Sequence, residues 1–117
     1  MQRLIIKIGG NMTEDMRKAF ENPRKAEAGT HTHYLKDSTE LYRMLSPKRL
    51  ELLRHIIKHQ HERRTISELA KELKRKQEAV SRDANFLVRH SLIEKIKEHR
   101  EVYLRALYGS LEIRLAA

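Results

Sequence analysis

The 117-residue chain contains no cysteine and no tryptophan, and few other aromatic residues. Without cysteine it can form neither disulfides nor thiolate metal sites, which fits a reducing compartment and predicts a cytoplasmic protein. With only four tyrosines and two phenylalanines, stacking of bases on an aromatic platform is an unfavourable binding mode. No apolar run approaches the roughly 20 residues of a membrane span, and the apolar stretch near the start is too short for a secretory signal.

Positive charge is what the chain has in excess. Lys and Arg number 25 against 16 acidic residues, a formal net charge of +9. Residues 46–117 hold 17 of the basic and 10 of the acidic residues, so most of the excess lies there. A small basic protein is expected to bind a polyanion, most often nucleic acid, although an anionic membrane surface would also attract it. The length fits one domain with a small appendage.

The first 45 residues read as a mixed α/β segment. Alternating apolar residues predict a strand over 3–8, which Gly9, Gly10 and Asn11 end. Thr13 is expected to cap a short helix that Pro23 ends, and 21–30 to form a loop. Further strands are predicted over 31–36 and, at the other end of the chain, over 111–115.

Two helices are predicted between residues 37 and 60. The first begins at Asp37 and Ser38. The second has Ser46 as its N-cap and Pro47 in its first turn, where these residue types are favoured. It is expected to end near His59 and to bury four apolar residues: Leu50, Leu53, Ile56 and Ile57.

Two shorter, closely spaced helices and a hairpin follow. Thr65 and Glu68 have the spacing of a capping box, which predicts a helix through Leu73. After the basic turn 74–76 another helix is expected over 77–90. Its inner face would be Val80, Ala84, Leu87 and Val88. Strands are predicted over 92–97 and 101–106 around the charged turn 98–100, with Ile96, Val102, Leu104 and Ala106 on one face.

This order of elements is that of a helix-turn-helix followed by a β-hairpin wing. The stretch TISELAKELKRKQEAVSRDANFLVRHSLIEKI resembles the MarR-like and ArsR-like winged helix-turn-helix regulators. The resemblance rests on the helix 66–70, the Val-Ser-Arg motif at 80–82 and the entry into the wing at 91–94. It covers about 41–106, and the strand-bearing start is similar to small prokaryotic DNA-binding proteins of this kind.

The resemblance implies an α+β, mainly α, fold. It divides the chain into an N-terminal extension over 1–45 for dimerisation or partner binding, a winged helix-turn-helix domain over 46–106 and a C-terminal strand over 107–117. Two positions depart from the family pattern. Ser91 stands where a glycine is usual, and the turn 74–76 has no glycine, so either the preceding helix is longer or Arg75 is left-handed.

The resemblance also implies which residues contact DNA. The recognition helix 77–90 would lie in the major groove, and the wing 92–106 on the minor groove or the backbone. Arg can bind guanine in a bidentate way, and Gln or Asn can bind adenine. The candidates for base reading are Gln77, Glu78, Ser81, Arg82 and Asn85; those for phosphate contacts are Thr65, Ser67, Lys71, Lys74, Arg75 and Lys76; those on the wing are Lys97, His99 and Arg100.

Metal binding and catalysis have weaker support. His55 and His59 have a spacing that can chelate zinc, but no cysteine and no glutamate motif completes a site. His31, His33 and His61 add no recognised pattern, so we expect surface histidines, no metal and no cofactor. No combination of nucleophile, base and orienting group is present, which predicts that the chain is not an enzyme.

We therefore predict a sequence-specific regulator of transcription that binds double-stranded DNA as a homodimer, since one winged domain reads one half-site. Apolar surface for the dimer is available at 3–8, 41–45 and 111–115. The segment before the winged domain is too short for an enclosed ligand pocket. The alternative is an antitoxin that represses its own operon and binds a small toxin protein through the first strand and 21–30.

Overall fold

The computed structural model describes residues 2–9, 16–17 and 29–115. Contacts between residues divide the chain into two units, one of Met1–Arg43 with Gly109–Ala117 and one of Met44–Tyr108. Of the helix expected after Thr13, only Met16 and Arg17 are described, and both are helical. The rest of that helix, its expected end at Pro23 and most of the expected loop lie outside the described residues. Each unit is described by itself.

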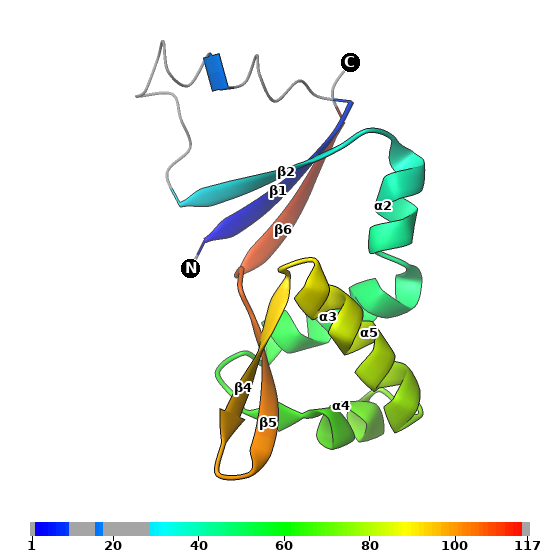
Figure 1. Cartoon of the computed structure of the whole chain (residues 1–117), viewed down its shortest axis with the longest axis vertical. Coiled ribbons are helices and arrows are strands. Elements are labelled where there is room, and N and C mark those ends of the chain that lie inside the picture. Colours follow the sequence, from blue (N-terminus) through cyan, green and yellow to red (C-terminus); the bar gives the residue numbers. More distant parts are fainter. Residues whose placement is uncertain (1, 10–15, 18–28, 116–117) are drawn as a thin grey trace. The chain divides into compact units, whose positions relative to one another are not determined.

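A parallel three-stranded sheet forms the first unit (Figure 1). Its order is β2-β1-β6, so strands from the two ends of the sequence lie side by side. The predicted strands at these places are confirmed to within a residue at each end. Their bounds are Arg3–Ile8 for β1, Thr30–Leu35 for β2 and Ser110–Leu115 for β6.

The central strand β1 is buried on both faces. Leu4, Ile5 and Ile6 are 1%, 2% and 0% exposed, as expected for a strand with a neighbour on each side and cover above and below. Ile6 lies beside Ile113 of β6. Because side chains alternate along strands, Leu111, Ile113 and Leu115 therefore share the face of Leu4, Ile6 and Ile8.

Helix α2 (Ser38–Met44) begins where the sequence predicts. Asp37 Oδ1 accepts a hydrogen bond from the Glu40 amide at 3.1 Å, and Glu40 Oε2 accepts one from the Lys36 amide at 2.6 Å. Acceptors at a helix N-terminus satisfy amides that have no partner in the helix and oppose its dipole. These local bonds explain why α2 starts at this point.

Three helices and a small antiparallel sheet form the second unit (Figure 1). The sheet order is β3-β5-β4. The strand β3 is missing from the sequence prediction, because two residues show no alternation. The bounds are Pro47–Lys58 for α3, Arg64–Thr65 for β3, Ile66–Glu72 for α4, Gln77–Arg89 for α5, Ile93–Glu98 for β4 and Glu101–Ala106 for β5.

The inner face of α3 differs from the predicted one. Leu52, which is 0% exposed, takes an inner position, whereas Leu50 is 43% exposed. The prediction that Leu50 is buried is therefore wrong. Leu50 lies two residues before Leu52, which is roughly 200° around a helix. The prediction is confirmed for Leu53 and Ile56, and Ile57 is half-buried.

The hairpin β4–β5 also corrects the prediction in one place. Ile96 pairs with Tyr103, so it lies on the face opposite to Leu104 and Ala106, not with them. Ile93, which pairs with Ala106, is 1% exposed and takes the inner position instead. The strand runs over Ile93–Glu98, one residue later than predicted. Its pairing with β5 is therefore shifted by one residue, and such a shift moves each side chain to the other face of the hairpin.

Both helices of the helix-turn-helix end in the same turn without glycine. After α4, the amides of Lys74 and Arg75 donate to the carbonyls of Lys71 (3.2 Å) and Ala70 (2.9 Å), and Lys74 has φ 55°. These bonds form a Schellman motif, in which the residue after the helix is left-handed. The expectation that Arg75 is left-handed, or that the helix continues, is therefore wrong: Lys74 takes that conformation and α4 ends at Glu72.

The end of α5 repeats the motif at Ser91. Its amide and that of Leu92 each donate at 3.0 Å, to the carbonyls of Val88 and Leu87, and Ser91 has φ 59°. A residue with a Cβ is strained in this region, whereas glycine is not. The departure from glycine noted in the sequence therefore falls at a position where glycine is the favoured residue.

We predict that Ser91→Gly raises the free energy of unfolding by about 1 kcal/mol, because it removes the left-handed strain. Chemical denaturation of the variant and the wild type measures the difference. Ser91→Ala, which keeps the Cβ, is the control and should give no gain. Equal stability of the glycine and alanine variants would contradict the prediction.

Candidate nucleic-acid interface

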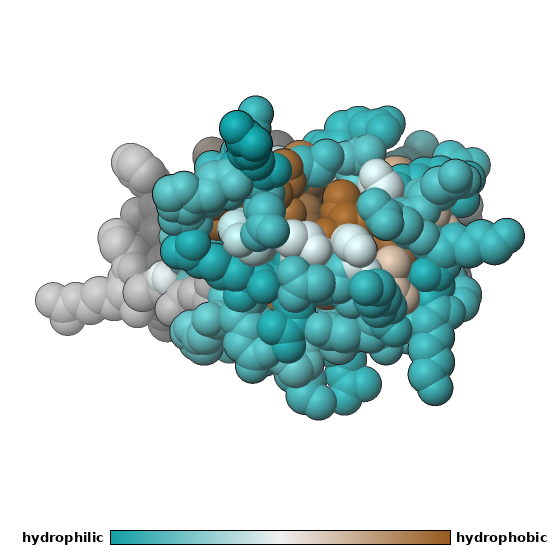
Figure 2. Space-filling model, turned by 90° about the horizontal axis from the view of Figure 1, so that it is seen from below, coloured by the Kyte–Doolittle hydropathy of each residue, from teal (hydrophilic) through white to brown (hydrophobic). Residues whose placement is uncertain are grey.

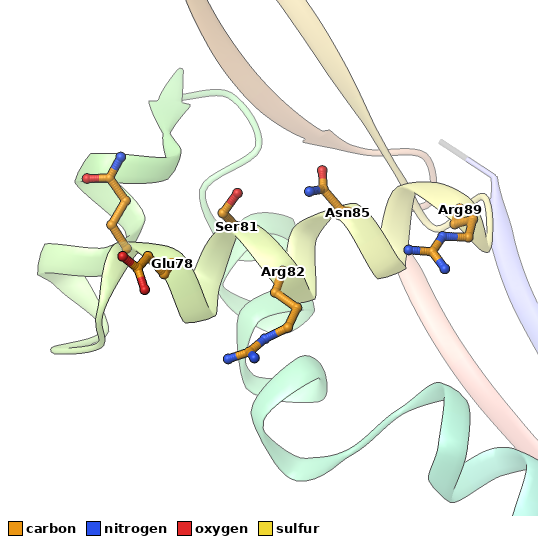
Figure 3. A pocket seen from close by; sticks show the side chains of 6 residues that line it. Glu78, Ser81, Arg82, Asn85 and Arg89 are labelled. Carbon is orange, nitrogen blue, oxygen red and sulfur yellow. The ribbon is translucent and has the colours of Figure 1, made fainter.

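The outer face of α5 carries a row of polar side chains (Figure 3). Val80, Ala84 and Leu87 are 0% exposed on the inner face, which confirms the predicted orientation of this helix. The residues on the opposite side line an open hollow: Gln77, Glu78, Ser81, Arg82, Asn85 and Arg89. The structure thus brings all five predicted base-reading residues together.

Arg89 belongs to this face but is missing from the sequence prediction. It is exposed and lies four residues after Asn85, so it continues the row of residues at helical spacing. Extending the i, i+4 pattern by one more turn would have found it. Ser81 is half-buried, whereas the other five lining residues are exposed.

The side chains of this face point in different directions. Figure 3 shows Ser81 and Asn85 on one side of α5 and Arg82 on the other. Asn85 Oδ1 accepts a hydrogen bond from Lys95 Nζ of β4. This bond joins the outer face of α5 to the hairpin and leaves the Asn85 amide group as a donor. Lys95, an exposed cation beside the helix, was also not foreseen.

Asp83 is the charged residue that α5 turns towards the core, and it is 9% exposed. Its Oδ2 accepts a hydrogen bond from Arg75 Nη2 at 2.7 Å, and its Oδ1 lies 3.4 Å from Arg49 Nε. The guanidinium of Arg49 also lies 3.7 Å from the centre of the Phe86 ring. One carboxylate thereby connects α3, the turn after α4, and α5.

The structure places Arg75 differently from the sequence prediction. Its side chain is 11% exposed and paired with Asp83, so it stabilises the fold instead of facing a phosphate. The signal for this pair is present in the sequence. Asp83 lies three residues after Val80 and four before Leu87, at an inner position, where a charge needs a partner of opposite sign.

The other predicted phosphate contacts divide into engaged and exposed groups. The Thr65 hydroxyl accepts from the Glu68 amide at 3.2 Å and donates to Glu68 Oε1 at 3.1 Å, so the predicted capping box is confirmed. That hydroxyl is therefore used within α4. Ser67 is half-buried, and Lys71, Lys74 and Lys76 are exposed.

The cations of the second unit fall into two groups. Arg63 pairs with Glu98, and Arg105 pairs with Glu94. Other cations have no ion pair with any residue in the described ranges: Lys71, Lys74, Lys76, Arg82, Arg89, Lys97 and Arg100. These seven residues belong to α4, the turn, α5 and the wing, where they produce a positive potential. On α3, Lys48, Arg54 and Lys58 also have no ion pair within the described ranges.

The wing ends in a tight turn. His99 and Arg100 are exposed and have φ values of 50° and 72°. Two left-handed residues between antiparallel strands form a type I′ turn, which matches the twist of a hairpin but favours Asn and Gly. Figure 2 shows one face of the chain, on which mostly hydrophilic residues surround a smaller hydrophobic area.

His55, on α3, joins a polar network with Glu72 and Arg64. His55 Nε2 lies 2.5 Å from Glu72 Oε2, and Arg64 also pairs with Glu72. The hydrogen bond from His55, followed by the contact with Arg64, holds the pKa of Glu72 below its ordinary value. Within the described ranges no group of three or more His, Cys, Asp or Glu residues could hold a metal ion.

Comparison with family models gives a match over residues 44–113 to the model described as HVO_A0114. The chain belongs to the HVO_A0114 family. The match covers α3 to β5, and with them the outer face of α5 and its hairpin. Comparison of this HVO_A0114 family member with curated proteins gives no match.

Several solved structures are similar to the chain. MepR, a transcription regulator of the Staphylococcus aureus multidrug efflux pump MepA, is 20% identical, with 83% of this chain and 66% of that chain covered and a TM-score of 0.53. NolR from Sinorhizobium fredii is 24% identical over 60% and 67%, with a TM-score of 0.51. A predicted DNA-binding transcriptional regulator from E. coli is 14% identical over 83% and 84%, with a TM-score of 0.50.

These identities are low, so the likeness shows the fold: a winged helix-turn-helix of the α+β class. The fold class inferred from the sequence is thereby confirmed. In this HVO_A0114 family chain, α4 and α5 are the helix-turn-helix and β4–β5 the wing. No described helix is long and apolar enough to span a membrane.

We predict that Asp83→Ala lowers the free energy of unfolding by about 2–4 kcal/mol, because Arg75 loses its partner in a poorly exposed position. Urea denaturation measures the loss. Arg82→Ala, at the neighbouring but exposed position, is the control and should change stability by less than about 0.5 kcal/mol. An Asp83→Ala variant as stable as the control would contradict the role given to this carboxylate.

Glu72 should make the fold sensitive to acid. Its pKa in the folded chain lies below its ordinary value of 4.5, so the unfolded chain binds this proton first as the pH falls. The stabilisation is therefore fully present above about pH 4.5 and is lost as the pH falls through the folded pKa. The stability difference between wild type and Glu72→Gln should shrink in acid. A difference that does not vary between pH 7 and pH 3 would contradict this.

Proposed function

We propose that the chain is a sequence-specific regulator of transcription that binds double-stranded DNA. One observation carries the proposal: the exposed face of α5 presents Gln77, Arg82 and Asn85 beside cations without ion-pair partners. In a helix-turn-helix, the second helix lies in the major groove and its N-terminal residues reach base edges. The fold shared with transcription regulators supports this reading.

The outer face of α5 has suitable donors and acceptors for base edges. Arg82 can bind O6 and N7 of guanine in a bidentate way, and Gln77 can bind adenine. Glu78 can accept from cytosine, and Ser81 can contact a base or a phosphate. Asn85 is held by Lys95, which fixes its amide group as a donor. Arg89, at the far end of the row, adds positive charge.

The flanking elements supply phosphate contacts. Lys71, Lys74 and Lys76 are exposed just before α5. No side chain caps the first turn of α5, so its amides are available to an anion. Lys97, His99 and Arg100 on the wing would reach the minor groove or its backbone. We remove Arg75 from this set because it is paired with Asp83, and Thr65 because its hydroxyl is engaged in the capping box.

The finer assignments extend this proposal. The likeness of the sequence to MarR-like and ArsR-like regulators favours a regulator that works as a homodimer on a pseudo-palindromic site, as a repressor or as an activator. Residues 1–45 and 107–117 would then provide the dimer contacts. The alternative antitoxin function depends on a partner surface at 21–30, most of which lies outside the described residues. A small protein that co-purifies with the chain would favour that alternative.

We predict that Arg82→Ala weakens binding to DNA from the chain's own promoter by about 1–3 kcal/mol and leaves binding to scrambled DNA nearly unchanged, because a base contact is lost. Fluorescence anisotropy at several salt concentrations measures both. Arg54→Ala, at another exposed arginine, is the matched control. Lys76→Ala should weaken binding to both DNAs alike and reduce the salt slope, as expected for a phosphate contact.

Three outcomes would sort the possibilities. Promoter DNA bound ~10³-fold or more tightly than scrambled DNA supports a sequence-reading regulator. Equal binding of both DNAs with a steep salt slope would leave only a non-specific phosphate-binding face. Absence of binding to either DNA would overturn the proposal.

A further inference from the structure

The sheet of the first unit has an edge strand with exposed apolar residues. β6 pairs with β1 on one side and is the last strand of the sheet within the described ranges. Ile113 and Leu115 of β6 share the face of Ile6 and Ile8, and they are 43% and 80% exposed. An edge strand offers unpaired backbone groups to a further strand. Exposed apolar residues at such an edge point to a partner.

The charges of β6 indicate which partner fits. Glu112 and Arg114 flank Ile113, and Arg114 Nη2 lies 3.1 Å from Glu112 Oε2 on the same face. If a second copy of β6 lies antiparallel with Ile113 opposite Ile113, each Glu112 faces an Arg114 and each Leu111 faces a Leu115. Opposite charges directly across an antiparallel pair are stabilising. The strand is therefore complementary to itself.

Other registers lose this match. A shift of one residue places charged residues on the apolar face. A shift of two residues brings Glu112 opposite Glu112, or Arg114 opposite Arg114, and like charges in that position are destabilising. A parallel arrangement in register also places like charges side by side. The edge strand β2, THTHYL, contains no pair of opposite charges and has no comparable self-complementarity.

We propose that two copies of the chain associate through their β6 strands, antiparallel and centred on Ile113, to form a continuous six-stranded sheet. A two-fold axis through the centre of this pair relates the copies, as in most homodimers. This inference rests on the proposed function in one respect: it specifies the interface of the homodimer that was proposed with that function. The interface itself depends on the first unit alone.

A disulfide can report the register because the chain has no cysteine of its own. Residues opposite each other in an antiparallel pair have Cα atoms about 4.5–5.5 Å apart, which a disulfide can bridge. We expect Ile113→Cys to form a covalent dimer under mild oxidation. Leu115→Cys is the matched control: it is the more exposed position, yet the two copies of residue 115 would lie about 13 Å apart. Leu115→Cys mixed with Leu111→Cys should cross-link.

Charge reversal tests the same register without a covalent bond. Glu112→Arg and Arg114→Glu each place like charges across both sides of the axis, so each should raise the dimer dissociation constant by about tenfold or more. An equimolar mixture of the two variants should form a heterodimer, because opposite charges again face each other. The double variant should restore the homodimer. Glu51→Arg, an exposed glutamate on α3, is the control for the change in charge, and circular dichroism checks that each variant folds.

Sedimentation equilibrium and cross-linking decide the outcome. A wild-type chain that is monomeric at ~100 μM, cross-linking of Leu115→Cys alone in preference to Ile113→Cys, or single variants that dimerise like the wild type would each overturn the inference. Failure of the proposed function is a separate result. A monomer that still distinguishes promoter from scrambled DNA would refute the interface alone, whereas a β6 dimer that binds neither DNA would refute the function alone.

Discussion

The carboxylate of Asp83 connects three parts of the winged unit. It is held between Arg75, from the turn after α4, and Arg49 on α3, at a position that is 9% exposed. A charge in such surroundings is stable only with partners in good geometry. The apolar residues beside it, Val80 and Leu87, supply burial but no direction, since hydrophobic contacts are not directional. The apolar stripe of α5 decides which side of the helix faces the core, and the ion pair adds a directional constraint that holds this rotation against α3 and the turn after α4.

Backbone strain is concentrated around the same helix. All described non-glycine residues with positive φ lie in the turn between α4 and α5, just after α5 or in the wing: Lys74, Ser91, His99 and Arg100. Glycine would adopt these conformations at lower cost. Two of the four residues, Lys74 and Arg100, are cations without an ion-pair partner among the described residues. Backbone strain that persists in a folded chain is typical of functional segments. Here the strained residues include Lys74 and Arg100, which carry positive charge in two turns.

Most of the architecture could be inferred from residue patterns. The capping box at Thr65, the apolar spacing of Val80, Ala84 and Leu87, and the alternation in β1 each report a local rule that the folded chain obeys. Two of the differences are shifts in phase. The sequence predicts that Leu50 and Ile96 lie on buried faces, but the inner positions are two residues from Leu50 and one residue from Ile96. Short apolar runs at a helix end or in a hairpin fit more than one register, so the pattern alone does not choose between them.

The sequence by itself determined the winged helix-turn-helix order, the basic character of its second half and the outward residues of α5, because these follow from periodicity and composition. Tertiary structure decided which charges are internal. Arg75 and Lys74 are neighbours in one basic turn, yet one is paired with Asp83 and the other is exposed. It also decided that β6 lies beside β1. Pairings between distant segments depend on which surfaces meet after folding, and no local pattern specifies them.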